Sequence, residues 1–304
     1  MKKIFEIRFT KLHGLGNDFI VTNARDVGAK ENKSAAKMFL SRLARAICDR
    51  HTGVGADGFL AVLPPRSHGH DARVRFFNAD GSEAEMSGNG IRCVAGFLSL
   101  DRPGRRGMKI ETAVGIREIE TIEAGDGRWL FRVAMGNPVL EPARIPFRAP
   151  KVKSPVVDYP LKTRLGTFRV TATSMGNPHC SLFVDELDRA NWPEIGREIE
   201  NHPLFSNRTN VEFVKVISRR EIEVRFWERG VGRTASSGTG SCGAVVAGIL
   251  NGFTGRQVCV RTLAGNLEVS WPENGEVNLT GPAEFIAHGK YRAAQAASKK
   301  LGRA

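Results

Sequence analysis

The sequence has few cysteines, and they follow no pattern that would bind metal or form disulfides. There are five: Cys48, Cys93, Cys180, Cys242 and Cys259. Their number is odd and no two are spaced as CxxC, which excludes a disulfide framework and is typical of reduced thiols in a cytoplasm. Long apolar runs are also missing, because no stretch approaches the ~18–20 residues of a membrane span. The start, MKKIFEIRFTKL, is charged and lacks the apolar core region of a signal peptide. We therefore expect a cytoplasmic protein with no membrane partner.

Metal and nucleotide signatures are absent from the sequence as well. The histidines show neither HExxH nor another paired ligand spacing, so we expect no metal. GVGADG at 53–58 matches G-x-G-x-x-G, but the dinucleotide fingerprint needs a strand before it and a helix after it. Here a helical pattern at 35–49 precedes the motif and a strand-like run at 59–63 follows it. Because this order is reversed, we expect no nucleotide cofactor.

The chain is basic without a concentrated basic surface. Its 304 residues include 45 Lys and Arg against 32 Asp and Glu, a formal net charge of +13. The arginines are scattered, and the densest cluster, at 102–109, lies in an expected loop with no aromatic residue among them. Nucleic acid is therefore a disfavoured partner, and a small acidic molecule is the expected one. The length and the 41% of hydrophobic residues suit one large soluble domain or two of ordinary size.

Two parts of the sequence repeat each other at an offset of 150 positions. Val74-Arg75-Phe76 matches Val224-Arg225-Phe226, and Ser87-Gly88 matches Ser237-Gly238. Further matches are Gly90 with Gly240, Thr112 with Thr262 and Gly115 with Gly265. A period this long excludes a solenoid, whose repeats have about 20–50 residues. The repeat therefore predicts two related units of similar topology.

Each repeated part has the pattern of a strand, a turn and a helix. Residues 73–77 and 221–227 have strand patterns, and apolar residues at helical spacing follow the serines at 87 and 237. We expect these serines to begin helices that are buried on at least one side. Two further helices are predicted at 35–49 and 193–200.

These elements predict an α+β protein of two similar lobes. Glycine and proline at 135–138 interrupt a strand pattern and suggest a hinge there. The expected division is an N-terminal lobe at 1–134, a C-terminal lobe at 135–281, a segment at 282–294 that returns to the first lobe, and a flexible tail at 295–304.

The start of a helix is a place where an acid can bind. Its unpaired N–H groups and partial positive charge attract carboxylates and phosphates. Two such starts facing one cleft would hold a carboxylate between the lobes, with one serine on each side. A cofactor-independent racemase or epimerase uses two opposed groups of this kind, since one removes a proton and the other delivers one. The pattern alone leaves a simpler interpretation open, in which both serines are only helix N-caps.

Five motifs, in order along nearly the whole chain, resemble those of the diaminopimelate epimerase family. They are HGLGNDFI at 13–20, FNADGSEAEMSGNGIRC at 77–93, SMGNPHC at 174–180, ERGVGRT at 228–234 and SSGTGSC at 236–242. The resemblance implies two pseudo-symmetric lobes, each a curved, mostly antiparallel sheet wrapped around a central helix. It also implies cofactor-free inversion of one α-carbon of L,L-diaminopimelate to the meso isomer, for lysine and cell-wall synthesis. Because the family often forms dimers, a homodimer is implied too.

The resemblance assigns roles to particular residues of this chain. Gly88-Asn89 and Gly238-Thr239 would supply backbone donors for the reacting carboxylate, and His179 would lie beside the reacting carbon. Glu228-Arg229 would recognise the distal amino-acid end of the substrate. The implied substrate-binding asparagines are Asn17, Asn78, Asn177 and Asn210.

The chain differs from most of the family at the two residues that would carry out the reaction. Ser87 and Ser237 stand where most members have their catalytic cysteines. A thiol has an ordinary pKa of ~8.5, which a helix N-terminus can lower. A serine hydroxyl is a far weaker acid and needs a neighbouring base. Cys93 and Cys242 lie more than one turn into the expected helices, so we expect them to be buried rather than to replace the missing thiols.

Three interpretations of the serines stay open. The chain could be a Cys→Ser variant that traps substrate, or a double-serine epimerase assisted by His179 or by water. It could also be a relative of the same fold that isomerises a different acid or only binds a ligand.

Overall fold

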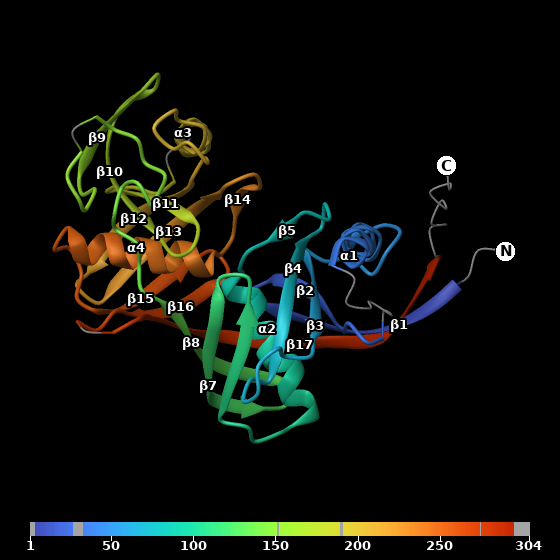
Figure 1. Cartoon of the computed structure of the whole chain (residues 1–304). Coiled ribbons are helices and arrows are strands. Elements are labelled where there is room, and N and C mark those ends of the chain that lie inside the picture. Colours follow the sequence, from blue (N-terminus) through green and yellow to red (C-terminus); the bar gives the residue numbers. More distant parts are fainter. Residues whose placement is uncertain (1–3, 27–32, 151, 189–190, 274, 295–304) are drawn as a thin grey trace, which may run out of the picture.

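Two buried helices, α2 (Gly88–Asp101) and α4 (Gly238–Leu250), organise the fold (Figure 1). The computed structural model describes residues 4–26, 33–150, 152–188, 191–273 and 275–294. In that part of the chain, four helices accompany a sheet of 17 strands. Helix α4 is buried all the way from Gly238 to Gly248, because its side chains are small or apolar on every face. The protein is therefore mostly sheet, with its two inner helices enclosed by strands.

Eight strands close into a barrel around α2. They are β1 (Ile4–Gly14), β2 (Asn17–Asn23), β3 (Gly58–Leu63), β4 (Ala72–Asn78), β6 (Gly107–Thr112), β7 (Gly115–Gly125), β8 (Arg128–Gly136) and β17 (Val277–Ala294). Each pairs with the next in this order, and β17 pairs with β1 to complete the ring. The pairs β2–β3 and β4–β6 are parallel and the others antiparallel. The short β5 (Glu83–Ala84) pairs with β4.

A second set of strands covers α4. It consists of β9 (Tyr159–Thr163), β10 (Gly166–Ser174), β11 (Pro178–Phe183), β12 (Asn210–Ser218), β13 (Glu221–Glu228), β15 (Gln257–Thr262) and β16 (Gly265–Ser270), with β14 (Gly232–Thr234) paired to β13. Neighbours in this order are hydrogen-bonded, and β11–β12 and β13–β15 are the parallel pairs. Helix α4 packs against β10, β11, β12, β13 and β16.

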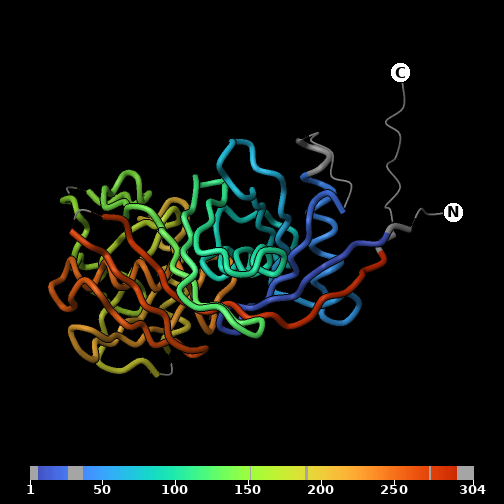
Figure 2. The backbone as a smooth tube through the Cα atoms, turned by 90° about the horizontal axis from the view of Figure 1, so that it is seen from below, coloured from blue at the N-terminus to red at the C-terminus, as the bar shows by residue number. Residues whose placement is uncertain are grey.

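The long strand β17 connects the two sets of strands. It pairs with β16 and β8 near its start and with β1 along the rest of its length. Ile4 is opposite Ala294, so β1 begins and β17 ends at the same end of the molecule, as Figure 2 shows. Strand β8 ends at Gly136, which has a φ of +88°. The expected interruption at 135–138 therefore coincides with the end of a strand, and the expected tail at 295–304 lies outside the described residues.

The other two helices lie outside the strands. Helix α1 (Lys33–Cys48) packs on β3 and β4, and α3 (Trp192–Glu200) packs on β12 and β13. Each covers a small apolar cluster of its own. The predictions at 35–49 and 193–200 are confirmed, with ends that shift by one or two residues. No helix in the described residues is long and apolar enough to cross a membrane.

Substitution of Phe131 tests whether the side chains inside the barrel stabilise the fold. It is fully buried on β8 and packs in the cluster that contains α2. Phe131→Ala is expected to lower the free energy of unfolding by about 3–5 kcal/mol, because it leaves a cavity. Ile122→Ala on the neighbouring β7 is the control, since Ile122 is 37% exposed and the change there should stay within about 0.5 kcal/mol. Urea unfolding followed by circular dichroism measures both, and equal losses would contradict the assignment of Phe131 to the core.

Candidate active site

The starts of α2 and α4 touch each other through two glycines. A Cβ atom placed on Gly88 would lie 2.9 Å from Cα of Gly238. A Cβ atom on Gly238 would lie equally close, 2.9 Å, to Cα of Gly88. These separations are too short for two carbon atoms, so a side chain at either position would push the helices apart. The two helix N-termini are therefore joined backbone to backbone.

Ser87 and Ser237 cap these helices in the same conformation. Their φ and ψ angles are −139° and 123° at Ser87 and −138° and 123° at Ser237. Ser87 Oγ accepts a hydrogen bond from Gly90 N–H at 3.0 Å, and Ser237 Oγ accepts one from Gly240 N–H at 3.3 Å. The expected helix starts are confirmed. The other N–H groups of the two first turns, with the helix dipoles, make this junction suitable for a carboxylate.

A chain of hydrogen bonds leads from the start of α4 to a buried carboxylate. Asn177 Nδ2 donates to Thr239 Oγ1 at 3.3 Å, and Asn177 Oδ1 lies 2.9 Å from His179 Nε2. On the other side of the imidazole, Nδ1 lies 2.6 Å from Glu212 Oε1. His179 and Glu212 are 0% and 1% exposed. The Glu212 carboxylate therefore fixes the ring so that Nε2 faces Asn177 and the start of α4.

Glu228 lies against Ser237. The Thr234 hydroxyl donates to its carboxylate at 2.7 Å, and the Ser237 hydroxyl lies near enough to the same carboxylate to stabilise its charge. Burial raises the pKa of Glu228 above its ordinary value, against the hydrogen bond from Thr234 and the smaller effects of His179 and Ser237. The family resemblance pairs Glu228 with Arg229 at the distal end of a substrate. The structure adds a feature at the other end, since this carboxylate also lies near a candidate catalytic hydroxyl, that of Ser237.

A second chain of hydrogen bonds runs from the start of α2. Arg92 Nη2 donates to Asn89 Oδ1 at 2.7 Å, and Asn89 Nδ2 donates to Asn17 Oδ1 at 3.3 Å. Asn17 Nδ2 in turn donates to Asp57 Oδ2 at 2.9 Å, and Asp57 pairs with Arg50. The structure therefore brings together Asn17 and Asn89, which lie 72 positions apart in the sequence.

The other candidate residues differ in their surroundings. Asn210 is buried, donates to the Pro178 carbonyl at 2.8 Å and accepts from Arg229 N–H at 2.9 Å. It therefore holds the loop of Arg229 against the beginning of β11. Asn78 is exposed, and its amide donates to Ser82 Oγ at 2.9 Å, which is the local bonding of a turn.

Sequence patterns did not reveal Glu212 and Arg92. Glu212 lies on β12, and the parallel register with β11 places it opposite Ser181, two residues from His179. Only this register brings it to the imidazole, because no local motif contains both residues. Arg92 did carry a signal, since it is a charged residue within an otherwise apolar helix start.

Cys93 and Cys242 do not reach the helix starts. Both are fully buried, and burial raises the pKa of each thiol to about 12. Their expected burial is confirmed. A thiol that stays protonated at neutral pH is a poor proton acceptor, so these cysteines do not supply the missing catalytic thiols.

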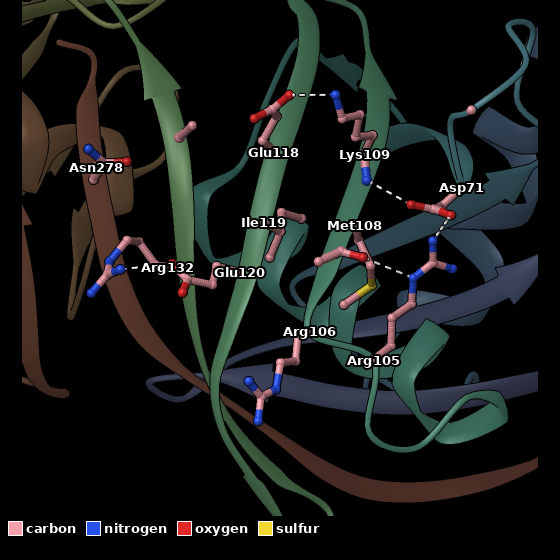
Figure 3. Close-up of a pocket in the computed structure, with 13 residues that line it drawn as sticks. Asp71, Arg105, Arg106, Met108, Lys109, Glu118, Ile119, Glu120, Arg132 and Asn278 are labelled. Carbon is pink, nitrogen blue, oxygen red and sulfur yellow. Dashed lines mark hydrogen bonds and ion pairs between the residues drawn. The ribbon is translucent and has the colours of Figure 1, made fainter.

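A separate pocket of about 460 Å³ lies over β6, β7 and β8 (Figure 3). Its charges pair with one another, Lys109 with Glu118 at 2.9 Å and Arg132 with Glu120 at 2.7 Å. None of the candidate catalytic or substrate-binding residues lines it. We therefore place the candidate active site at the junction of the helix starts and not in this pocket.

Comparison with known proteins identifies the family of the chain. The family described as "Diaminopimelate epimerase" matches residues 9–141 and 171–286. The chain belongs to the diaminopimelate epimerase family. A diaminopimelate epimerase from Pelotomaculum thermopropionicum is 48% identical over 292 residues, which cover 94% of this chain and 99% of that protein. One from Desulforudis audaxviator is 47% identical over 289 residues, with 94% and 99% covered. The resemblance seen in the five motifs is confirmed.

Solved structures with far lower sequence identity share the fold of this chain. A hydroxyproline epimerase from Agrobacterium vitis, with bound trans-4-OH-L-proline, has a TM-score of 0.71 at 14% identity. That match covers 97% of this chain and 95% of the other. A methylitaconate-delta-isomerase has a TM-score of 0.66 at 15% identity, with 96% and 97% covered. At these identities the likeness shows the fold alone.

The raised pKa of Glu228 predicts a pH-dependent stability. Because the fold favours its neutral form, Glu228 stabilises the protein below its ordinary pKa of ~4.3 and loses this contribution as pH rises through the raised pKa. Glu228→Gln stays neutral at every pH and keeps an oxygen that can accept from Thr234. Relative to the unchanged protein, its free energy of unfolding should therefore rise with pH across this range. Chemical denaturation at a series of pH values measures the difference.

Glu118→Gln is the control for this prediction. Glu118 is fully exposed, and its hydrogen bond with Lys109 lowers its pKa, so the sign of the pH effect should be reversed and small. A difference between Glu228→Gln and the unchanged protein that is flat or falls with pH would contradict the assignment of a raised pKa.

Proposed function

We propose that this chain is a cofactor-independent epimerase that inverts one α-carbon of L,L-diaminopimelate to give the meso isomer, in lysine and peptidoglycan biosynthesis. Relatives that it matches over nearly their whole length are named diaminopimelate epimerase. One observation of the structure carries the proposal. The starts of α2 and α4 meet at Gly88 and Gly238, each behind a serine in the same conformation. A carboxylate held at this junction would have one serine on each side of its α-carbon.

The substrate carboxylate is held by the first N–H groups of both helices in this proposal. Gly88 and Asn89 donate from α2, and Gly238 and Thr239 donate from α4. When the α C–H bond breaks, its electron pair delocalises into this carboxylate and increases its negative charge. Fixed N–H groups and helix dipoles then stabilise the transition state more than the bound substrate, which is the requirement for catalysis.

On one face of the α-carbon, Ser237 and Glu228 transfer the proton together. The α-proton moves to Ser237 Oγ while the hydroxyl proton passes to the nearby Glu228 carboxylate. A serine hydroxyl becomes a proton acceptor only with such a neighbouring base. The raised pKa of Glu228 supports this role, because a more basic carboxylate accepts a proton more readily.

On the other face, Ser87 delivers a proton to the carbon and regains one from solvent, to which Glu228 releases the proton that it accepted. Its oxygen already accepts from Gly90 N–H, which leaves the hydroxyl proton free to point at the substrate. His179 assists from the side of α4, since Asn177 links its Nε2 to Thr239. The remaining contacts to the substrate are assigned to Asn17, Asn78, Asn177 and Asn210, and recognition of its distal amino-acid end to Glu228 with Arg229.

We also propose that the chain consists of two pseudo-symmetric lobes, 1–134 with 282–294, and 135–281. Matching local geometry at the 150-position offset supports this division. Thr112 Oγ1 donates to the Gly115 carbonyl at 2.7 Å, and Thr262 Oγ1 donates to the Gly265 carbonyl at 2.7 Å. The matched conformations of Ser87 and Ser237 support it in the same way.

A second candidate function follows from the two serines themselves. Without a thiol on either face, the same junction would bind a diamino acid and not turn it over, or would serve an isomerase of another acid. Calorimetry with L,L-, meso- and D,D-diaminopimelate separates these possibilities, because only a diaminopimelate site discriminates among the three isomers.

Exchange of the α-proton with heavy water tests the proposed reaction. L,L-Diaminopimelate incubated with the protein in D2O should gain one α-deuterium as meso isomer forms, measured by mass spectrometry and chiral chromatography. Ser237→Ala should slow deuterium uptake by about 10²–10⁴-fold, because it removes the proton-transfer group next to Glu228. Ser67→Ala, at an exposed serine, is the control and should leave the rate unchanged. Tight binding of L,L-diaminopimelate without deuterium uptake would leave only the binding function.

Restoring the thiols tests the identity of the substrate. Ser87→Cys combined with Ser237→Cys should raise kcat for diaminopimelate by about 100-fold or more, because a thiol at a helix N-terminus ionises far more readily than a hydroxyl. Steady-state kinetics of L,L-diaminopimelate epimerisation measure the change. If the double-cysteine protein binds and epimerises no diaminopimelate, the site is built for another ligand.

A further inference from the structure

Arg92 is a fully buried cation directly behind the start of α2. Its side chain is 0% exposed, and in the described part of the chain no carboxylate forms an ion pair with it. Burial lowers its pKa to about 10, so the guanidinium still carries its charge at neutral pH. A buried charge without a counter-ion is unfavourable. An apolar side chain of similar volume would fill the space without this penalty, so the charge itself calls for an explanation.

All three hydrogen bonds of Arg92 go to uncharged oxygens, and two belong to the active-site turn. Nη1 donates to the Gly88 carbonyl at 3.0 Å and Nη2 donates to Asn89 Oδ1 at 2.7 Å. Nε donates to the Pro282 carbonyl of β17 at 3.0 Å. A guanidinium holds its donors in one rigid plane, so these bonds fix the first turn of α2 relative to the barrel wall.

The barrel wall leaves room for this guanidinium by means of two glycines. A Cβ on Gly14 of β1 would lie 3.1 Å from Nη2. A Cβ on Gly281 of β17 would lie 2.4 Å from Leu267 Cδ2 and 3.1 Å from Arg92 Cζ. A side chain at Gly14 would therefore press against the guanidinium, and one at Gly281 would press against both Leu267 and the guanidinium.

Arg92 has no matching arginine in the second half of the repeat. The residue 150 positions after Arg92 is Cys242, a small apolar side chain that lies within electrostatic range of the guanidinium. The hydrogen bonds of this charge that involve a helix start are therefore made to α2.

We propose that Arg92 is a positioning residue for the substrate carboxylate. It holds the Gly88 carbonyl inward, so that the N–H groups of the same turn face the junction. It orients the Asn89 amide so that Nδ2 reaches Asn17, which fixes both asparagines. When the carboxylate is bound, its negative charge compensates the positive charge of the buried guanidinium. This inference rests on the proposed function, because it takes the ligand to be an α-amino carboxylate.

Calorimetry with L,L-diaminopimelate tests the inference. Arg92→Met keeps the length of the side chain and removes the charge, and it should weaken binding by about 10- to 100-fold, the loss expected for charged hydrogen bonds. Arg92→Lys keeps the charge and should recover part of the affinity. Arg256→Met is the control, since Arg256 is half-exposed and pairs with Glu273 at the surface, and its affinity should equal that of the unchanged protein. Affinity of a folded Arg92→Met within threefold of the unchanged protein would overturn the inference and leave the proposed function intact.

A second measurement tests the orientation of Asn89 by Arg92 without any ligand, so that failure of the inference is distinguishable from failure of the proposed function. Hydrogen exchange of side-chain amides, followed by NMR, should be at least about tenfold faster for Asn89 in Arg92→Met or Arg92→Lys, because its orienting bonds are lost. Asn251 is the internal control, since its Nδ2 donates to Thr171 Oγ1 and to the Ala247 carbonyl, both at 2.8 Å. Its exchange should not change. Unaltered exchange of Asn89 in both variants would overturn the inference.

Discussion

The contact between Gly88 and Gly238 is the constraint on which the rest of the structure depends. It brings two helix N-termini within backbone distance, so the positive ends of two dipoles coincide. Such an arrangement is unfavourable in the absence of an anion, and the fold maintains it by burying both helices. Helix α4 is enclosed on all sides, and α2 fills a closed barrel. The stability of the core therefore offsets the cost of bringing the two helix N-termini together.

The two sides of this junction are not chemically equal. Ser237 lies near a carboxylate of raised pKa, that of Glu228, and a histidine held by Glu212 lies near the same helix. Ser87 has the hydrogen bond from Gly90, and behind it lies the buried guanidinium of Arg92. A proton acceptor on one side and a positive charge behind the other suit a reaction that moves a proton through a carbanion.

The sequence predicted local elements well and the site only in part. The strand patterns at 73–77 and 221–227 lie within β4 and β13, and both serines cap helices, because these features depend on residues close together in the chain. The family resemblance assigned Asn17 and Asn89 to one site, and their hydrogen bond to each other is seen only in the structure. The bond between His179 and Glu212 depends on the register of two parallel strands, and the glycines around Arg92 depend on closure of the barrel. The periodicity of apolar residues predicts neither the register between two strands nor the closure of a barrel.

A crystal structure of the chain with L,L-diaminopimelate tests the central claim most directly. The account predicts that one α-carboxylate accepts hydrogen bonds from N–H groups of both helices, at about 2.7–3.2 Å. It also predicts that Ser87 Oγ and Ser237 Oγ lie on opposite faces of that α-carbon. A ligand bound elsewhere, or a carboxylate held by only one helix with both serines on the same face, would contradict it.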